Sequence, residues 1–168
     1  MKNLILKIVS LVLVLSTGCK AKYGFKGITI PQEAKSISVA FFQNNSAMAG
    51  PTVSQKFTEK LRDVCSSQTN LALVKNNGDL HFEGYINDYS VVPVAIQSND
   101  QAALNRLSLS VMVKYANKAD PGKNFEQLFS RFYDFSSSQN LSSIEQTALD
   151  EINRQLTEDI FNRAFNNW

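Results

Sequence analysis

Residues that could take part in catalysis are few in this sequence, and His81 is its only histidine. A serine–histidine–aspartate arrangement would have to use His81, and no second feature of the sequence supports one. A lone histidine in a strand is more often a hydrogen-bonded structural residue than a ligand. Asp79 and Glu83 could form a carboxylate pair, but a Gly-Asp turn and an exposed strand face are better explained by solvated carboxylates. Without a second histidine or a Cys-x-x-Cys pair, a metal site is not expected either, and neither is a cofactor.

Cys19 is the residue to which the sequence gives the clearest chemical role. A basic start at Lys2 and Lys7 precedes the apolar run 8–15 and the small residues Ser16-Thr17-Gly18. This is the layout of a secretory signal peptide, and the run falls far short of the roughly 18–20 apolar residues that span a bilayer. With Cys19 directly after the small residues, the segment resembles a bacterial lipoprotein signal, except that serine stands three residues before the cysteine.

The resemblance to lipoprotein signals implies that Cys19 becomes the first mature residue and carries an N-acyl and an S-diacylglycerol lipid. An ordinary signal with an incidental cysteine, or a buried N-terminal helix, is the alternative. We therefore expect a signal peptide over 1–18, a lipidated tether over 19–36 and a folded domain over 37–168.

Charge and cysteine content narrow the function further. The chain has 17 Lys and Arg residues against 15 Asp and Glu residues, and removing Lys2 and Lys7 leaves 15 against 15. A nearly neutral mature protein lacks the cationic field of a general nucleic-acid binder. Once Cys19 is lipidated, Cys65 has no partner for an intramolecular disulfide, and we interpret it as a small buried hydrophobe.

Hydrophobic periodicity predicts one α/β domain. Strands are expected at 36–43, 80–94, 106–117 and 125–136, and helices over 51–68 and from the Ser142-Ser143 caps to about 165. The order β-α-β-β-β-α predicts a two-layer sandwich in which two helices pack on one face of a mixed four-stranded sheet. Gly84, inside the long second strand, indicates a bulge or a close approach.

The other face of the sheet must meet water or a partner. Alternation places on it side chains that are aromatic or hydroxylic more than charged: Tyr85, Tyr89, Ser108, Ser110, Met112 and Lys114. An uncovered face of this kind is an interaction surface by default.

An ordered set of segments along the domain gives a more specific indication. They are residues 37–39, 51–61, 67–71, 78–86, 89–93, 105–107, 129–132, 152–162 and 167–168. Together they resemble the lipopolysaccharide-assembly lipoprotein family LptE in its Bacteroidetes form, over nearly all of 23–168. No single segment is diagnostic, since Asp-Leu-x-Phe-Glu-Gly before a strand also suits other periplasmic α/β domains.

The resemblance implies a non-enzymatic protein at the outer membrane. Members of the family plug the lumen of the β-barrel LptD and help to deliver lipopolysaccharide to the cell surface. Lipopolysaccharide contact is attributed in the family to basic side chains, for which Arg106, Lys114 and Arg131 are the equivalents by position near the strands. With Tyr85 and Tyr89 they are the candidate lipopolysaccharide or partner contacts, although a neutral chain argues against a strongly cationic face.

Two other functions stay open at this point. A free-standing, periplasm-facing lipoprotein could bind a small ligand or an envelope glycan, and it would need an apolar pocket between sheet and helices. An enzyme would depend on His81.

Overall fold

A computed structural model describes residues 30–31, 33–94 and 104–165. Its elements are β1 (Ser36–Val39), β2 (Gln43–Asn44), α2 (Pro51–Gln68), β3 (Ala72–Val74), β4 (Leu80–Val94), β5 (Leu104–Asn117), the 3-10 turn η1 (Pro121–Lys123), β6 (Phe125–Ser136) and α3 (Leu141–Phe165). The expected signal, the lipidated Cys19 and most of the tether lie outside the described residues.

One mixed sheet carries the domain, with strand order β3-β1-β4-β5-β6 and β2 paired to β4 beyond the end of β1. The strands β3, β1 and β4 run parallel, whereas β4, β5 and β6 are antiparallel and much longer. The predicted α/β sandwich is confirmed, but the sheet has six strands instead of four. The added strands β2 and β3 have two and three residues, too few for alternation to distinguish a strand from a loop.

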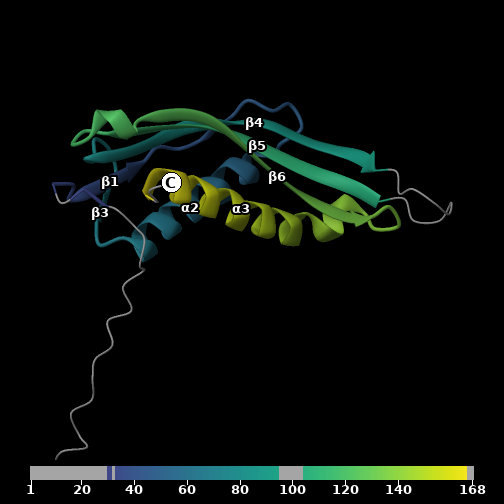
Figure 1. Cartoon of the computed structure of the whole chain (residues 1–168). Coiled ribbons are helices and arrows are strands. Elements are labelled where there is room, and N and C mark those ends of the chain that lie inside the picture. Colours follow the sequence, from purple (N-terminus) through teal and green to yellow (C-terminus); the bar gives the residue numbers. More distant parts are fainter. Residues whose placement is uncertain (1–29, 32, 95–103, 166–168) are drawn as a thin grey trace, which may run out of the picture.

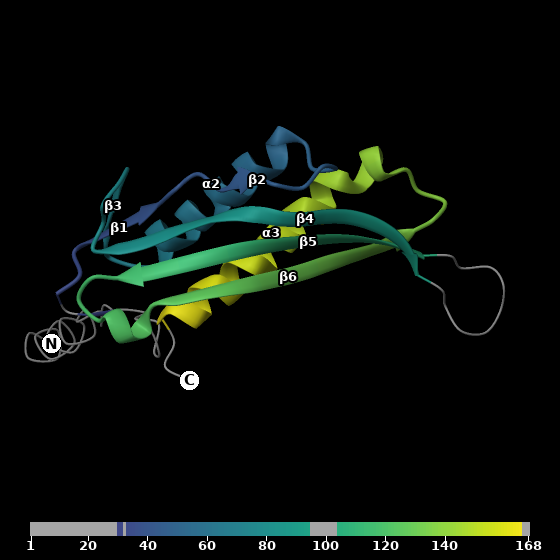
Figure 2. The ribbon, with the colours of Figure 1, turned by 90° about the horizontal axis from the view of Figure 1, so that it is seen from above.

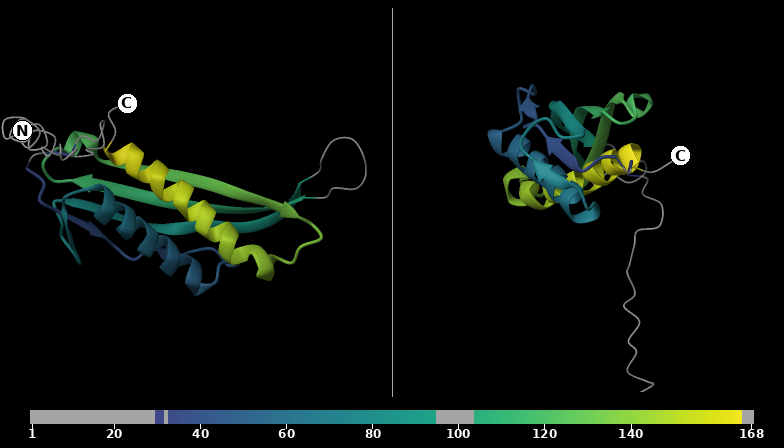
Figure 3. Two further views of the ribbon diagram at one scale, coloured as in Figure 1. Left: turned by 90° about the horizontal axis from the view of Figure 1, so that it is seen from below. Right: turned by 90° about the vertical axis from the view of Figure 1, so that its left-hand side faces the viewer.

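Both helices cover the same face of the sheet and leave the other uncovered (Figures 1 and 3). Helix α2 has the predicted limits, and its stripe Val53, Phe57, Leu61 and Val64 is buried. Helix α3 begins at Leu141, so the predicted serine caps are wrong: the amide and hydroxyl of Ser143 both donate to the Asn140 carbonyl. None of the described helices is long and apolar enough to cross a membrane.

Gly84 lets the chain pack closely in the first half of β4. A Cβ atom at this position would overlap the Met112 carbonyl oxygen and lie 2.7 Å from Cε1 of Phe42. The Phe42 ring is fully buried and meets Phe57 of α2 edge to face at 5.0 Å between centroids. The close approach predicted at Gly84 is therefore confirmed.

A bulge follows in the same strand. The pairing of β4 with β5 shifts between Ile86 and Asp88, so Asn87 is an extra residue. Because side chains of a strand alternate between faces, one extra residue reverses the alternation from Asp88 onwards.

Asp79 joins three segments that are distant in sequence. Its Oδ2 accepts hydrogen bonds from the amides of Lys35 and Ser36, both at 2.9 Å, and from the Ser36 hydroxyl at 2.8 Å. Its own carbonyl accepts from the Lys118 amide at the end of β5. Asp79 is therefore a structural carboxylate, and its interpretation as merely solvated was wrong.

These hydrogen bonds predict a contribution of Asp79 to acid stability. The Lys35 amide, followed by the Ser36 hydroxyl and amide, lowers the pKa of Asp79 below its ordinary 3.8. A lowered pKa in the folded state means that the contribution is complete above the ordinary pKa and is lost as the pH falls toward the lowered value. We expect Asp79→Asn to lower Tm at pH 7 and to flatten the dependence of Tm on pH below about 4, as measured by calorimetry.

Asp63→Asn, at an exposed position of α2, is the matched control for this effect. Equal acid sensitivity of the wild type and Asp79→Asn would contradict the assignment.

Candidate functional site: the open face of the sheet

The face of β4, β5 and β6 that points away from the helices, here called the open face, is visible in Figure 2. Direct pairing of the strands arranges its side chains in rows that cross the sheet. The rows are Glu83–Lys114–Glu126, Tyr85–Met112–Leu128, Asp88–Ser110–Ser130, Ser90–Ser108–Phe132 and Val92–Arg106–Asp134. A charged row is thus followed by an apolar row, two rows rich in hydroxyls and a second charged pair.

Arg106 is held on two sides. Its Nε and Nη2 donate to the two carboxylate oxygens of Asp134 at 2.7 and 2.8 Å. Its guanidinium carbon lies 3.7 Å from the ring centroid of Phe132, a cation–π distance. The hydrogen bonds from Arg106 lower the pKa of Asp134. The guanidinium is therefore already neutralised in the folded domain.

Lys114 is paired in the same way. Its Nζ lies 2.8 Å from Oε1 of Glu83, the residue directly opposite on β4. The hydrogen bond with Lys114 lowers the pKa of Glu83, with a smaller effect of His81. Glu83 is therefore paired, not simply solvated as expected.

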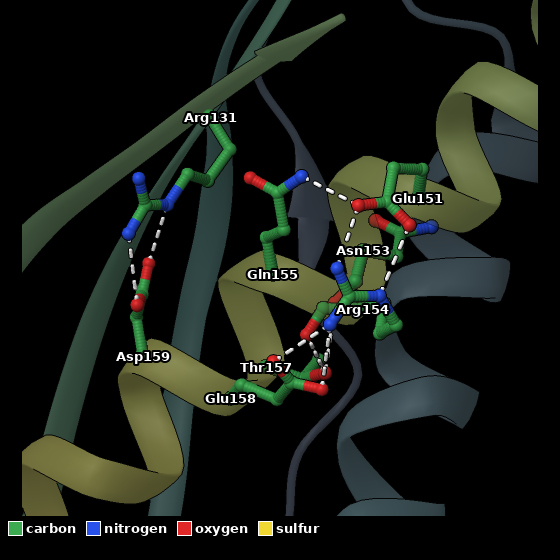
Figure 4. A network of polar contacts seen from close by, with 8 residues as sticks. All are labelled: Arg131, Glu151, Asn153, Arg154, Gln155, Thr157, Glu158 and Asp159. Atoms are coloured by element: carbon green, nitrogen blue, oxygen red, sulfur yellow. Dashed lines mark hydrogen bonds and ion pairs between the residues drawn. The ribbon is translucent and has the colours of Figure 1, made fainter.

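Arg131 lies on the opposite side of the sheet, which its register position on β6 explains. Its guanidinium donates to both carboxylate oxygens of Asp159 on α3, at 2.6 and 3.0 Å (Figure 4). Close by on α3, Arg154 is bracketed by Glu151 and Glu158. Arg131 therefore fastens the edge strand to the helix layer, and the structure does not bring the three basic candidates together.

The two tyrosine candidates are also separated. Tyr85 lies on the open face, between Glu83 and the bulge. The prediction that Tyr89 shares this face was wrong, because the extra residue Asn87 turns it toward the helices. Tyr89 is buried, its hydroxyl donates to Glu145 of α3 at 2.6 Å, and burial together with this partner raises its pKa.

His81 has hydrogen-bond partners within the fold, as predicted. Its Nδ1 lies 2.7 Å from Oγ of Ser38, and its Nε2 lies 3.5 Å from Glu83. Ser38, His81 and Glu83 thus form a series of contacts that resembles a catalytic triad. However, Ser38 is fully buried, and its Oγ also accepts a hydrogen bond from the Gly78 amide. A hydroxyl without access to a substrate cannot act as a nucleophile, so this chain of contacts is structural.

Other reactive groups are equally inaccessible. Cys65 is fully buried, and desolvation raises the pKa of its thiol to about 12. This confirms its interpretation as a small core residue. Within residues 30–31, 33–94 and 104–165, no group of three or more His, Cys, Asp or Glu side chains is placed to hold a metal ion.

Between the sheet and the helices, the structure shows packed aromatic rings. Phe82 lies 4.8 Å from Tyr115 and 6.4 Å from Phe165, measured between ring centroids. Tyr115 also contacts Phe165 at 6.1 Å. This part of the interlayer space is filled, which argues against a ligand pocket there.

The open face is thus suited to contact with a partner more than to chemistry. Its five rows contain four carboxylates, Glu83, Asp88, Glu126 and Asp134, against the two cations Arg106 and Lys114. A surface with this balance does not attract anions.

Comparison with known families identifies the family of this domain. The family model described as LptE, lipopolysaccharide-assembly, matches residues 34–164, from just before β1 to the last turn of α3. The chain belongs to the LptE family. The resemblance seen in the sequence is thereby confirmed.

Several solved structures are similar to this LptE-family chain at low sequence identity. A minor lipoprotein from Acinetobacter baumannii is 12% identical with a TM-score of 0.47, covering 79% of this chain and 97% of that chain. Lipoprotein B from Nitrosomonas europaea is 12% identical with a TM-score of 0.46, covering 80% and 88%. The PelC dodecamer from Paraburkholderia phytofirmans gives 8%, 0.43, 75% and 90%. No curated protein sequence matches the chain.

Sequence reasoning missed two residues of the LptE-family open face, Phe132 and Asp134. Both hold Arg106 from the neighbouring strand. The signal was present, because the turn 118–123 joins two alternating strands and fixes which residues stand opposite. Counting outward from that turn would have placed Asp134 beside Arg106.

Proposed function

We propose that this LptE-family protein is a non-enzymatic outer-membrane lipoprotein, anchored through lipid on Cys19. Its domain fills the lumen of an LptD-like β-barrel and assists delivery of lipopolysaccharide to the cell surface. The observation that carries the proposal is the family match over 34–164, which spans both layers of the domain and not merely one motif.

The chemistry of the open face supports contact with a barrel lumen. Barrel lumens are polar, with charged and hydroxyl groups pointing inward. Ser130, which is exposed, and Ser108, which is partly exposed, offer donors and acceptors to such a lumen, and the charges of Arg106 and Lys114 beside them are paired. The excess of carboxylates argues that this face meets the barrel wall, because the phosphates of lipopolysaccharide would be repelled.

Two features favour a role without catalysis. The serine of the Ser38–His81–Glu83 line is buried, and the Cys65 thiol is inaccessible with a raised pKa. A plug needs neither group.

Co-purification tests the partner directly. Full-length protein extracted from membranes in mild detergent is expected to carry a large β-barrel protein with it, and its depletion is expected to reduce lipopolysaccharide at the surface. Ser130→Glu, at an exposed position in the middle of the open face, adds a fifth carboxylate. We expect at least a roughly ten-fold loss of recovered barrel, the equivalent of about 1.4 kcal/mol.

Ser143→Glu, exposed in the first turn of α3, is the matched control and should leave recovery unchanged. Recovery of the wild-type protein without any barrel partner would refute the proposal. Equal recovery of the barrel with Ser130→Glu and Ser143→Glu would show that the open face does not contact the barrel.

Lipidation of Cys19 predicts an all-or-none result. Cys19→Ala should abolish incorporation of labelled palmitate and release the protein in a soluble or unprocessed form, because a thioether-linked lipid needs the cysteine sulfur. Cys65→Ala should keep full labelling, since that thiol is buried. Labelling that persists in Cys19→Ala would disprove the anchor.

A further inference from the structure

A second surface lies at the opposite edge of the sheet, where β3 ends before its neighbour does. A groove of about 540 Å³ opens there, lined by residues 39–41 at the end of β1, by Arg62 of α2 and by residues 73–76 of β3 and the following turn. Its volume lies within the range of roughly 300–1,000 Å³ usual for binding pockets. Figure 2 shows β3 and β1 at this margin, beside α2.

The backbone of β3 is available for pairing on its outer side. The Ala72 amide points toward β1 and donates a hydrogen bond to the carbonyl of Lys35, the residue just before β1. In a parallel ladder alternate residues bond to the same neighbour, so the N–H and C=O of Leu73 face away from β1. In the described sheet β3 is the terminal strand, and its three residues are exposed.

The groove continues the line of β3 along β1. Beyond Val74 the described part of the chain places no strand on the outer side of β1. The Val39 carbonyl instead accepts hydrogen bonds from Nε and Nη2 of Arg62 at 3.2 and 2.9 Å. The Arg62 side chain thus takes the place of a neighbouring strand as the hydrogen-bond partner of the Val39 carbonyl.

The lining combines apolar surface with positive charge. Phe41, Leu73 and Val74 are 46%, 43% and 36% exposed, unusually high for large apolar side chains. Among the described residues that line the groove, Arg62 and Lys75 are the charged ones, and both are cationic. The complementary occupant therefore has apolar side chains and a carboxylate.

We propose that the outer edge of β3 and the groove beyond it form a strand-addition site for an extended segment of a partner protein that carries an acidic residue between apolar ones. The partner backbone pairs with Leu73, and its carboxylate meets Arg62 and Lys75. Strand addition derives affinity from main-chain hydrogen bonds and specificity from alternate side chains. An acyl chain would leave the outward amide and carbonyl of Leu73 unpaired, which favours a polypeptide over a lipid. This site is independent of the open face.

Peptide binding to the full-length protein tests the site. The probe is a fluorescein-labelled peptide of sequence Thr-Val-Glu-Val-Thr-Val, compared by fluorescence anisotropy with the same peptide carrying lysine in place of glutamate. We expect the glutamate peptide to bind at least about ten-fold more tightly, because charge-assisted hydrogen bonds are the stronger ones. Arg62→Gln should remove most of this difference.

A proline at the edge isolates the backbone contribution. Leu73→Pro deletes only an outward N–H and leaves the inward amides of β3 intact, and proline is tolerated on edge strands. Leu73→Ser removes the same side chain but keeps the N–H, so it is the matched control. Leu73→Pro should bind the glutamate peptide about five-fold more weakly than Leu73→Ser, as expected for one lost main-chain hydrogen bond.

Three outcomes would overturn the proposal: equal affinity for both peptides, equal affinity of both Leu73 variants, or no binding at millimolar peptide. Sedimentation with phosphatidylglycerol vesicles tests whether the groove binds a lipid headgroup instead of a polypeptide. Vesicle binding that is lost in Arg62→Gln and unchanged in Leu73→Pro would identify a headgroup site and refute strand addition.

Discussion

Gly84→Ala is expected to destabilise the domain by at least about 3 kcal/mol. The added Cβ overlaps the Met112 carbonyl oxygen of the neighbouring strand, and backbone cannot move aside as the end of a flexible side chain can. The added Cβ would also lie 2.7 Å from the Phe42 ring, and this ring already packs against Phe57. Urea unfolding followed by circular dichroism measures the loss.

Gly50 supplies the control for the same substitution. A Cβ atom at Gly50 meets nothing within 4 Å, and glycine and alanine at the residue before a helix differ by only about 1 kcal/mol or less. A Gly84→Ala variant as stable as Gly50→Ala would show that β4 and Phe42 can separate at little cost.

Phe82→Ala is expected to cost about 3–5 kcal/mol of folding free energy. The Phe82 ring is fully buried and contacts the rings of Tyr115 and Phe165, so its removal leaves a cavity where sheet and helix meet. Chemical denaturation again measures the loss of folding free energy.

Phe132→Ala removes the same atoms from the open face, where the ring is 50% exposed. Its loss should cost about 1 kcal/mol or less, mostly through the contact with Arg106. Similar losses in the two variants would contradict the assignment of the faces.

Helix α2 and the first half of β4 were predictable because strong local patterns specify them. The stripe from Val53 to Val64 repeats at helical spacing, and Pro51 marks the start. Leu80, Phe82 and Ile86 lie on the same side of the strand, with Gly84 between them, so their burial followed from the sequence.

Other features depend on pairing between distant segments. Strand β3 forms the edge of the sheet only because β1 lies beside it, and its three residues are too few to show a periodic pattern. The role of Asp79 depends on Lys35 and Ser36 reaching it from more than forty residues away. Neither contact is visible to local reasoning.

The candidate site shows the same division. Arg106 and Lys114 were predicted on one strand of alternating residues, and the register places both on the open face. Their neutralisation by Asp134 and Glu83 belongs to neighbouring strands. Arg131 was grouped with them by proximity in sequence to a strand, although alternation along β6 places it opposite Leu109, on the helix side.

The bulge at Asn87 also determines where the chain can change length. Since Asn87 is the unpaired residue, a chain without it would form a regular ladder and would keep Tyr89 beside Glu145. A one-residue deletion between Leu80 and Ile86 would instead turn over the side chains on one side of the gap and expose part of the core. Shortening of β4 by one residue is therefore expected to be tolerated at the bulge and rejected before it.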